Sequence, residues 1–87
     1  MRPISIKKLV KLYIKSPEFN RLRDRTQLDY KRFLKVLTKT FGDKTANSIS
    51  GKDARIAYEE WVERGIQLAN HVSVVAGRAY RYGREME

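Results

Sequence analysis

The chain has 87 residues, no cysteine and a formal net charge of +9, from 19 Lys and Arg against 10 Asp and Glu. A chain of this length buries roughly 60% of its unfolded surface, enough for one core of three or four helices, so we expect a single domain over residues 1–87. The composition excludes disulfides and thiolate metal sites, and no apolar run reaches the roughly 20 residues that span a membrane. Residues 1–5 lack the apolar core of a secretion signal. We therefore expect a cytoplasmic location and no membrane partner.

The positive charge is concentrated in the first part of the chain. Residues 1–52 carry 14 Lys and Arg against 4 Asp and Glu, whereas residues 53–68 carry 2 against 4 and residues 69–87 carry 3 against 2. Such asymmetry indicates an oriented electrostatic surface. The commonest partner of a compact domain with this balance is nucleic acid; a basic surface that is merely solvated is the alternative.

The first predicted helix begins at Ser5, which can cap it, and runs to about Lys15. Its apolar stripe consists of Ile6, Leu9, Val10, Tyr13 and Ile14. Its polar side carries Lys7, Lys8, Lys11 and Lys15. Pro17 disfavours helical geometry at Ser16 and ends the segment, so we expect residues 17–23 to form a connector.

The longest predicted helix spans residues 25–41, and both of its ends are marked. Asp24 can cap its start, with Gln27 as a partner in a pattern like a capping box. Gly42 stands where a left-handed C-terminal cap is favoured, since glycine has no side chain to clash at positive φ. The apolar face consists of Tyr30, Phe33, Leu34, Leu37 and Phe41. The polar face is almost purely cationic, with Arg25, Lys31, Arg32, Lys35 and Lys39.

Two more helices are predicted in the second half of the chain. Ser50, with Asp53 three residues later, caps a helix over residues 51–64 that Gly65 ends. Residues 66–68 then turn the chain into a last helix over about residues 69–82. The apolar positions of these helices are Ala54, Ala57, Tyr58, Trp61, Val62, Val72, Val75, Ala76, Ala79 and Tyr80. Because no strand alternation or repeat appears, the predicted fold class is all-α, a compact four-helix bundle.

The cations before and along the longest helix form the first candidate binding surface. Phosphate contacts need cations along a groove edge, and this series covers roughly 20 Å of helix. Its members are Arg21, Arg23, Arg25, Lys31, Lys35 and Lys39. Thr26 and Gln27 join it because backbone N–H groups in a first helical turn favour a phosphate, although Gln27 can instead be occupied as the cap partner.

A mixed polar stripe on the last helix forms the second candidate surface. It consists of Asn70, His71, Ser73, Val74, Arg78 and Arg81. Asn and Arg can read base edges, and an exposed Val can contact a thymine methyl group. We expect both surfaces to face one DNA duplex. The acidic residues Glu59, Glu60 and Glu63 should face away from it, because phosphates repel carboxylates.

The residues indicate no catalytic, cofactor-binding or metal site. His71 is the single histidine, and no acid or second ligand stands at a fixed helical spacing from it. Tyr80 falls on an apolar stripe, so we expect it and Tyr82 to pack against other parts of the protein. We expect Trp61 to anchor the core.

Several cues over residues 4–84 occur in an order found in a known family. Thr26, Tyr30 and Phe41-Gly42 are spaced as in a family helix, and residues 49–53 resemble the entry to the next helix, which Trp61 and Arg64-Gly65 close. Residues 69–83 resemble the family's last helix. Together these cues resemble the N-terminal core-binding domain of tyrosine recombinases and phage-type integrases, a SAM-like helical domain. Two departures stand in the last helix: Leu68-Ala69, where Ser or Thr is frequent, and Gly77, where a larger residue is usual.

The resemblance implies a SAM-like DNA-binding domain that forms one half of a C-shaped clamp on duplex DNA at a recombination site. The catalytic residues would belong to a separate domain that follows in the intact protein, so no catalysis is expected from this chain. The implied partners are duplex DNA and other protomers of the parent recombinase in a synaptic complex, the isolated domain being monomeric. The implied setting is a bacterial, archaeal or phage-infected cell.

Two other functions fit the same residues. One is a helical protein-interaction adaptor that uses the acidic helix and Val74. The other is a helix-turn-helix regulator, which is less favoured because about eight loop residues, rather than three or four, separate the second and third predicted helices.

Overall fold

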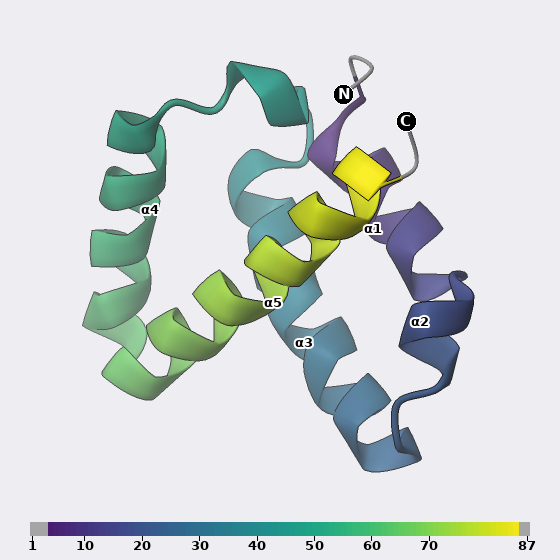
Figure 1. The fold of residues 1–87 in the computed structure, drawn as a ribbon. Helices are drawn as coiled ribbons and strands as arrows, with labels where there is room; N and C mark the ends of the chain where they lie inside the picture. The colour runs from purple at the N-terminus through teal and green to yellow at the C-terminus, as the bar shows by residue number, and fades with distance from the viewer. Residues whose placement is uncertain (1–3, 86–87) are drawn as a thin grey trace.

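A computed structural model of the protein describes residues 4–85 and places them in five α-helices and one 3-10 turn (Figure 1). The elements are α1 (Ile6–Ile14), α2 (Pro17–Asn20), α3 (Asp24–Phe41), η1 (Ala46–Ser48), α4 (Gly51–Arg64) and α5 (Ile66–Glu85). Over residues 4–85 the only β-type pairing is an isolated bridge between Ser5 and Thr45. The prediction of an all-α fold is confirmed. None of the described helices is long and apolar enough to cross a membrane.

α5 is the helix against which the other long helices pack. It contacts α1, α3 and α4, and it crosses in front of α3 in Figure 1. Its buried face is built from small residues: Ala69, Val72, Val75, Ala76 and Ala79. Small side chains let neighbouring helices approach closely, so α5 can pack against three other helices along its 20 residues.

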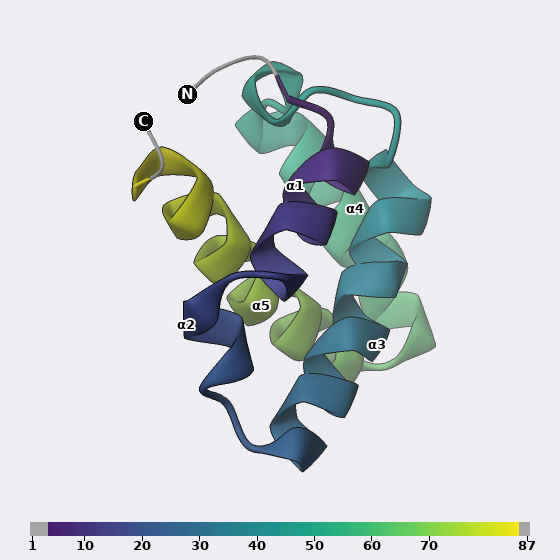
Figure 2. The same cartoon turned by 90° about the vertical axis from the view of Figure 1, so that its right-hand side faces the viewer.

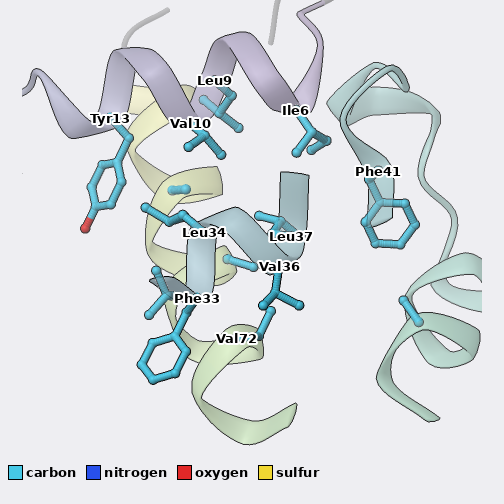
Figure 3. Packing of buried hydrophobic residues seen from close by; sticks show 14 of the residues in the cluster. Ile6, Leu9, Val10, Tyr13, Phe33, Leu34, Val36, Leu37, Phe41 and Val72 are labelled. Atoms are coloured by element: carbon cyan, nitrogen blue, oxygen red, sulfur yellow. The ribbon is translucent and has the colours of Figure 1, made fainter. Parts of the chain in front are cut away.

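A single hydrophobic core joins all of these elements. Figure 3 shows Ile6 and Val10 of α1 directed toward Leu34 and Leu37 of α3. Full burial of one large apolar side chain stabilises a protein by about 1.5–3 kcal/mol. The largest fully buried side chains are Tyr13, Phe19, Ile6, Leu9, Leu34, Val72 and Val75.

The segment 17–23, predicted as a connector, contains the short helix α2. Ser16 is extended, as Pro17 requires. The Ser16 hydroxyl accepts a hydrogen bond from the backbone N–H of Phe19 at 3.1 Å, and Pro17 occupies the first helical turn, where its missing N–H costs nothing. Phe19 is completely buried, and its ring lies 5.4 Å from that of Tyr13 and 6.5 Å from that of Tyr30. α2 therefore closes one end of the core.

The predicted cap at the start of α3 is wrong. Arg23 is the cap residue and makes no side-chain cap hydrogen bond, while Asp24 is already helical. The Gln27 side-chain amide donates instead to the carbonyl oxygens of Leu22 at 2.8 Å and Asn20 at 3.3 Å. These carbonyls lie at the end of α2 and in the loop after it, where backbone acceptors lack helical partners.

Two glycines at helix ends, Gly42 and Gly65, have different backbone conformations. Gly42 is right-handed, with φ −47° and ψ −41°, so the predicted left-handed cap is wrong there. A Cβ at position 42 would lie 2.5 Å from the carbonyl oxygen of Thr38, which explains the need for glycine. Among residues 4–85, Gly65 is the residue with positive φ, at 149°. Because it alone links α4 to α5, no turn over residues 66–68 is needed, and α5 covers Ile66–Glu85 instead of residues 69–82.

α1 lies beside α3 and runs in the opposite direction (Figure 2). The backbone N–H groups of Ile6 and Lys7 donate to the carbonyl oxygens of Lys44 at 3.0 Å and Gly42 at 3.2 Å, which holds the start of α1 at the end of α3. α2 and its loop then lead from the end of α1 to the start of α3. This arrangement makes the outer sides of α1 and α3 neighbours.

Candidate nucleic-acid interface

The predicted lysines of α3 form a ridge on its outer side. Lys31, Lys35 and Lys39 recur every four residues over about 12 Å of helix, and all three are exposed. At about 100° per residue, Lys31 and Lys35 each lie roughly 160° around the helix from the buried Phe33. Over residues 4–85, no carboxylate forms an ion pair with any of the three.

α1, which packs beside α3, carries a second row of lysines. Lys7, Lys8, Lys11 and Lys15 are exposed, and none has an ion-pair partner in the described part of the chain. Sequence periodicity predicts that they are exposed, but it carries no sign that α1 lies beside α3. We define the lysine face as the four lysines of α1 together with Lys31, Lys35 and Lys39 of α3. Their mutual repulsion is unfavourable in the free protein and is relieved when a polyanion binds.

The predicted stripe on α5 lies on the other flank of α3. All six of its residues are exposed, but the ring of His71 lies 5.0 Å from that of Phe33, and the guanidinium of Arg78 lies 6.0 Å from the ring of Tyr30. Lys31 and Lys35 point to the opposite side of α3 from Phe33. The structure therefore separates the two candidate surfaces, which the sequence predicts to face one duplex together.

Three predicted DNA-binding residues already have partners within the protein. The side-chain oxygen of Asn70 accepts a hydrogen bond from the hydroxyl of Tyr58 at 2.7 Å. The guanidinium of Arg81 lies 4.0 Å from the carboxylates of both Glu18 and Glu85. The side chain of Gln27 is held by two backbone carbonyls. These contacts compete with any contact that the three side chains make with DNA.

The other predicted residues lie around the start of α3. Arg21 and Arg23 are exposed in the loop that leads into the helix. Arg25 is 87% exposed and lies 3.8 Å from Asp29, while Thr26 is half-buried on the flank toward α5. The exposed carboxylate of Asp24 occupies the first helical turn, where it opposes the phosphate expected there.

The acidic residues of α4 lie far from the lysine face. Glu59, Glu60 and Glu63 are exposed on α4, which stands on the opposite side of the bundle from α1 and α2 (Figure 1). Ile56, on the same helix, is 47% exposed. The carboxylates of α4 and the lysines of α1 thus belong to helices on opposite sides of the bundle, although α4 also carries the exposed cations Lys52, Arg55 and Arg64.

The aromatic residues that could suggest catalysis or stacking are used in packing. Trp61 is buried, as predicted, and its indole N–H donates to the hydroxyl of Thr40 at 3.1 Å. Tyr80 is half-buried against the core, and this burial raises the pKa of its hydroxyl. The ring of Tyr82 lies 5.7 Å from that of Tyr13. Within residues 4–85 no group of three or more His, Asp or Glu side chains is placed to hold a metal ion.

Comparison of the chain with protein-family models, curated proteins and solved structures gave no match.

Proposed function

We propose that this domain binds duplex DNA through the lysine face. The observation that carries the proposal is the set of seven exposed lysines on two neighbouring antiparallel helices, none of them ion-paired over residues 4–85. Duplex DNA carries about one negative charge per 1.7 Å of its axis. Within α3 the lysines recur about one helical turn apart, which suits such a dense line of charge, and each phosphate contact releases a counterion.

Contacts of this kind fix the position of a protein on DNA without reading its sequence. Lysine is a point charge on a flexible stem, so the lysine face suits phosphates rather than base edges. Limited base readout would come from the stripe on α5, where Ser73, Val74 and Arg78 are exposed. The domain thus combines a strong general affinity for DNA with a weak preference for sequence.

We further propose that the domain is a SAM-like core-binding domain of the tyrosine-recombinase type. It is supported by the sequence cues, whose Thr26, Tyr30 and Phe41-Gly42 all fall on α3 or at its end. In this role the domain positions a separate catalytic domain at a recombination site, beside other protomers of the same recombinase. In this proposal the chain itself performs no strand cleavage, which the packing of Tyr80 and Tyr82 supports.

Charge reversal on α3 tests the proposal. The double variant Lys31→Glu/Lys35→Glu should weaken binding to a mixed-sequence duplex by at least about tenfold at low salt, measured by fluorescence anisotropy, because two phosphate contacts are replaced by repulsion. The matched control is Glu59→Lys/Glu63→Lys on α4, which should bind as well as the wild type or better. Exposed charges contribute only about 0–1 kcal/mol to stability each, so thermal melts should show both variants folded. An unchanged affinity in the lysine variant would refute the proposal.

The protein-interaction alternative is favoured by one feature of α4. Ile56 is 47% exposed on the helix that carries Glu59, Glu60 and Glu63. If the lysine variant binds DNA normally while Ile56→Glu abolishes binding to a cationic protein partner, the adaptor function gains.

A further inference from the structure

A cleft of about 240 Å³ lies between α3 and α5, on the flank of α3 that faces away from the lysine ridge. α3 contributes Thr26, Asp29, Tyr30 and Phe33 to its lining, and α5 contributes His71, Val74 and Val75. The cleft is open to solvent, so a single planar ring can approach its lining from outside.

The walls of the cleft suit the face of an aromatic ring. Phe33 is only 7% exposed, because the ring of His71 lies 5.0 Å and the guanidinium of Arg32 lies 5.2 Å from its ring. The rings open to a ligand are therefore those of His71 and the half-buried Tyr30. Val74, also in the lining, is 56% exposed and offers an apolar contact. Bases stack on aromatic side chains in a sequence-tolerant way, because every base presents a π-face.

Cations surround this aromatic floor. The guanidinium groups of Arg25 and Arg32 lie 3.8 Å and 3.9 Å from the carboxylate of Asp29. The guanidinium of Arg32 also lies 5.2 Å from the ring of Phe33, and that of Arg78 lies 6.0 Å from the ring of Tyr30. Because the cations come from both helices, they can approach phosphates on either side of a bound ring, in competition with the Asp29 carboxylate that holds Arg25 and Arg32.

This combination selects one kind of ligand. An aromatic floor with a cationic rim complements an aromatic ring that carries anions, which is the chemistry of a nucleotide. Asp29 and Thr26 add hydrogen-bond acceptors for the amino group of a base, and the two arginines partly neutralise the Asp29 charge. A paired base in a duplex cannot enter, because both of its faces are stacked; an unpaired base can.

We propose that the cleft between α3 and α5 binds one unpaired nucleobase of a DNA strand, with the flanking phosphates held by Arg25, Arg32 and Arg78. The site is separate from the lysine face, so this inference goes beyond the proposed duplex contact and does not depend on it.

The test compares two DNA probes that differ by one nucleotide. One is a paired duplex, and the other is the same duplex with a single unpaired 2-aminopurine, whose fluorescence falls when it stacks on an aromatic ring. The wild-type protein should bind the second probe at least about fivefold more tightly and quench its fluorescence. Equal affinity for the two probes would overturn the proposal.

Two variants and a control assign the preference to the cleft. Val74→Glu places a carboxylate at the edge of the cleft and should reduce the affinity ratio to about one, and His71→Ala should lower the ratio. Ile56→Glu, the same change at an exposed site on α4, should leave the ratio unchanged. A ratio that survives Val74→Glu would also refute the proposal. Lys31→Glu/Lys35→Glu should weaken the binding of both probes equally and leave their affinity ratio unchanged. An error in the proposed duplex contact can therefore be told apart from an error in the proposed cleft site.

Discussion

Gly65 fixes the angle between α4 and α5. Its φ of 149° lies in a region that residues with a side chain rarely adopt, and it is the sole residue between the two helices. A Cβ at this position would meet no atom closer than 4.0 Å, so the constraint comes from the backbone and not from space. We expect Gly65→Ala to lower the free energy of unfolding by about 1–3 kcal/mol, measured by urea denaturation.

Gly77 provides the matched control. It is exposed within α5, and a Cβ there would meet nothing within 4 Å. Gly77→Ala should raise the free energy of unfolding by about 1 kcal/mol, because glycine is a poor helix former. If both substitutions shift stability in the same direction, the special role of Gly65 is contradicted.

Single residues also show what the sequence could and could not predict. The burial of Trp61 follows from its place on an apolar stripe, but its hydrogen bond to Thr40 does not. The partner of Asn70 is Tyr58, and one partner of Arg81 is Glu18. Both partners lie on other helices, and the periodicity of one helix contains no information about its rotation against another. The sequence therefore predicts which side chains are exposed to solvent better than it predicts which of them lack a partner within the protein.

Among the elements, α4 has the cap that the sequence predicts. The Ser50 hydroxyl accepts a hydrogen bond from the Asp53 N–H at 3.1 Å, and the Asp53 carboxylate accepts one from the Ser50 N–H at 3.1 Å. The predicted cap of α3 had the same type of sequence signal but is not formed. The Gln27 side-chain amide instead donates hydrogen bonds to backbone carbonyls at the end of α2 and in the loop after it. A capping pattern thus predicts a helix start only where no nearby segment competes for the same side chain.

The cap of α4 should make the stability of the protein depend on pH. The backbone N–H of Ser50, followed by its hydroxyl, lowers the pKa of Asp53 below its usual value of 3.8. A lowered folded pKa means that the stabilisation is complete above the unfolded pKa and is lost as pH falls through the folded value. Asp53→Ala should therefore be less stable than the wild type at neutral pH, and the difference should shrink below about pH 4. A difference that stays constant from pH 7 to pH 2 in denaturation experiments would contradict this account.

α1 should contribute directly to DNA affinity. Each phosphate contact adds about 0.9 to the slope of log K against log salt. Lys7→Gln/Lys11→Gln should therefore reduce the magnitude of this slope by roughly 2 if both lysines contact phosphates. Lys52→Gln/Arg55→Gln on α4, two exposed cations outside the lysine face, should leave the slope unchanged. Equal slopes for the wild type and the α1 variant would show that Lys7 and Lys11 of α1 do not contact phosphates.

At the scale of the whole molecule, the bundle is flat, with extents of 33 × 31 × 17 Å. α4, with its acidic residues, forms one side in Figure 1, and α1 and α2 lie on the other. The sequence predicted this electrostatic orientation from the charge of successive segments. The periodicity of α3 predicts that its lysines and its aromatic residues lie on different faces, but it does not predict that α1 and α5 pack beside them, which separates the α5 stripe from the lysines.

The most direct measurement of the central claim is a map of the DNA-contacting surface in solution. The backbone NMR signals of the protein should be followed during titration with a mixed-sequence duplex. The account predicts that the largest shifts fall on Lys7, Lys11, Lys31 and Lys35, while Glu59, Glu60 and Glu63 stay quiet. If the shifted signals cluster on α4 and the two lysine rows do not move, the lysine face is not the DNA-binding surface.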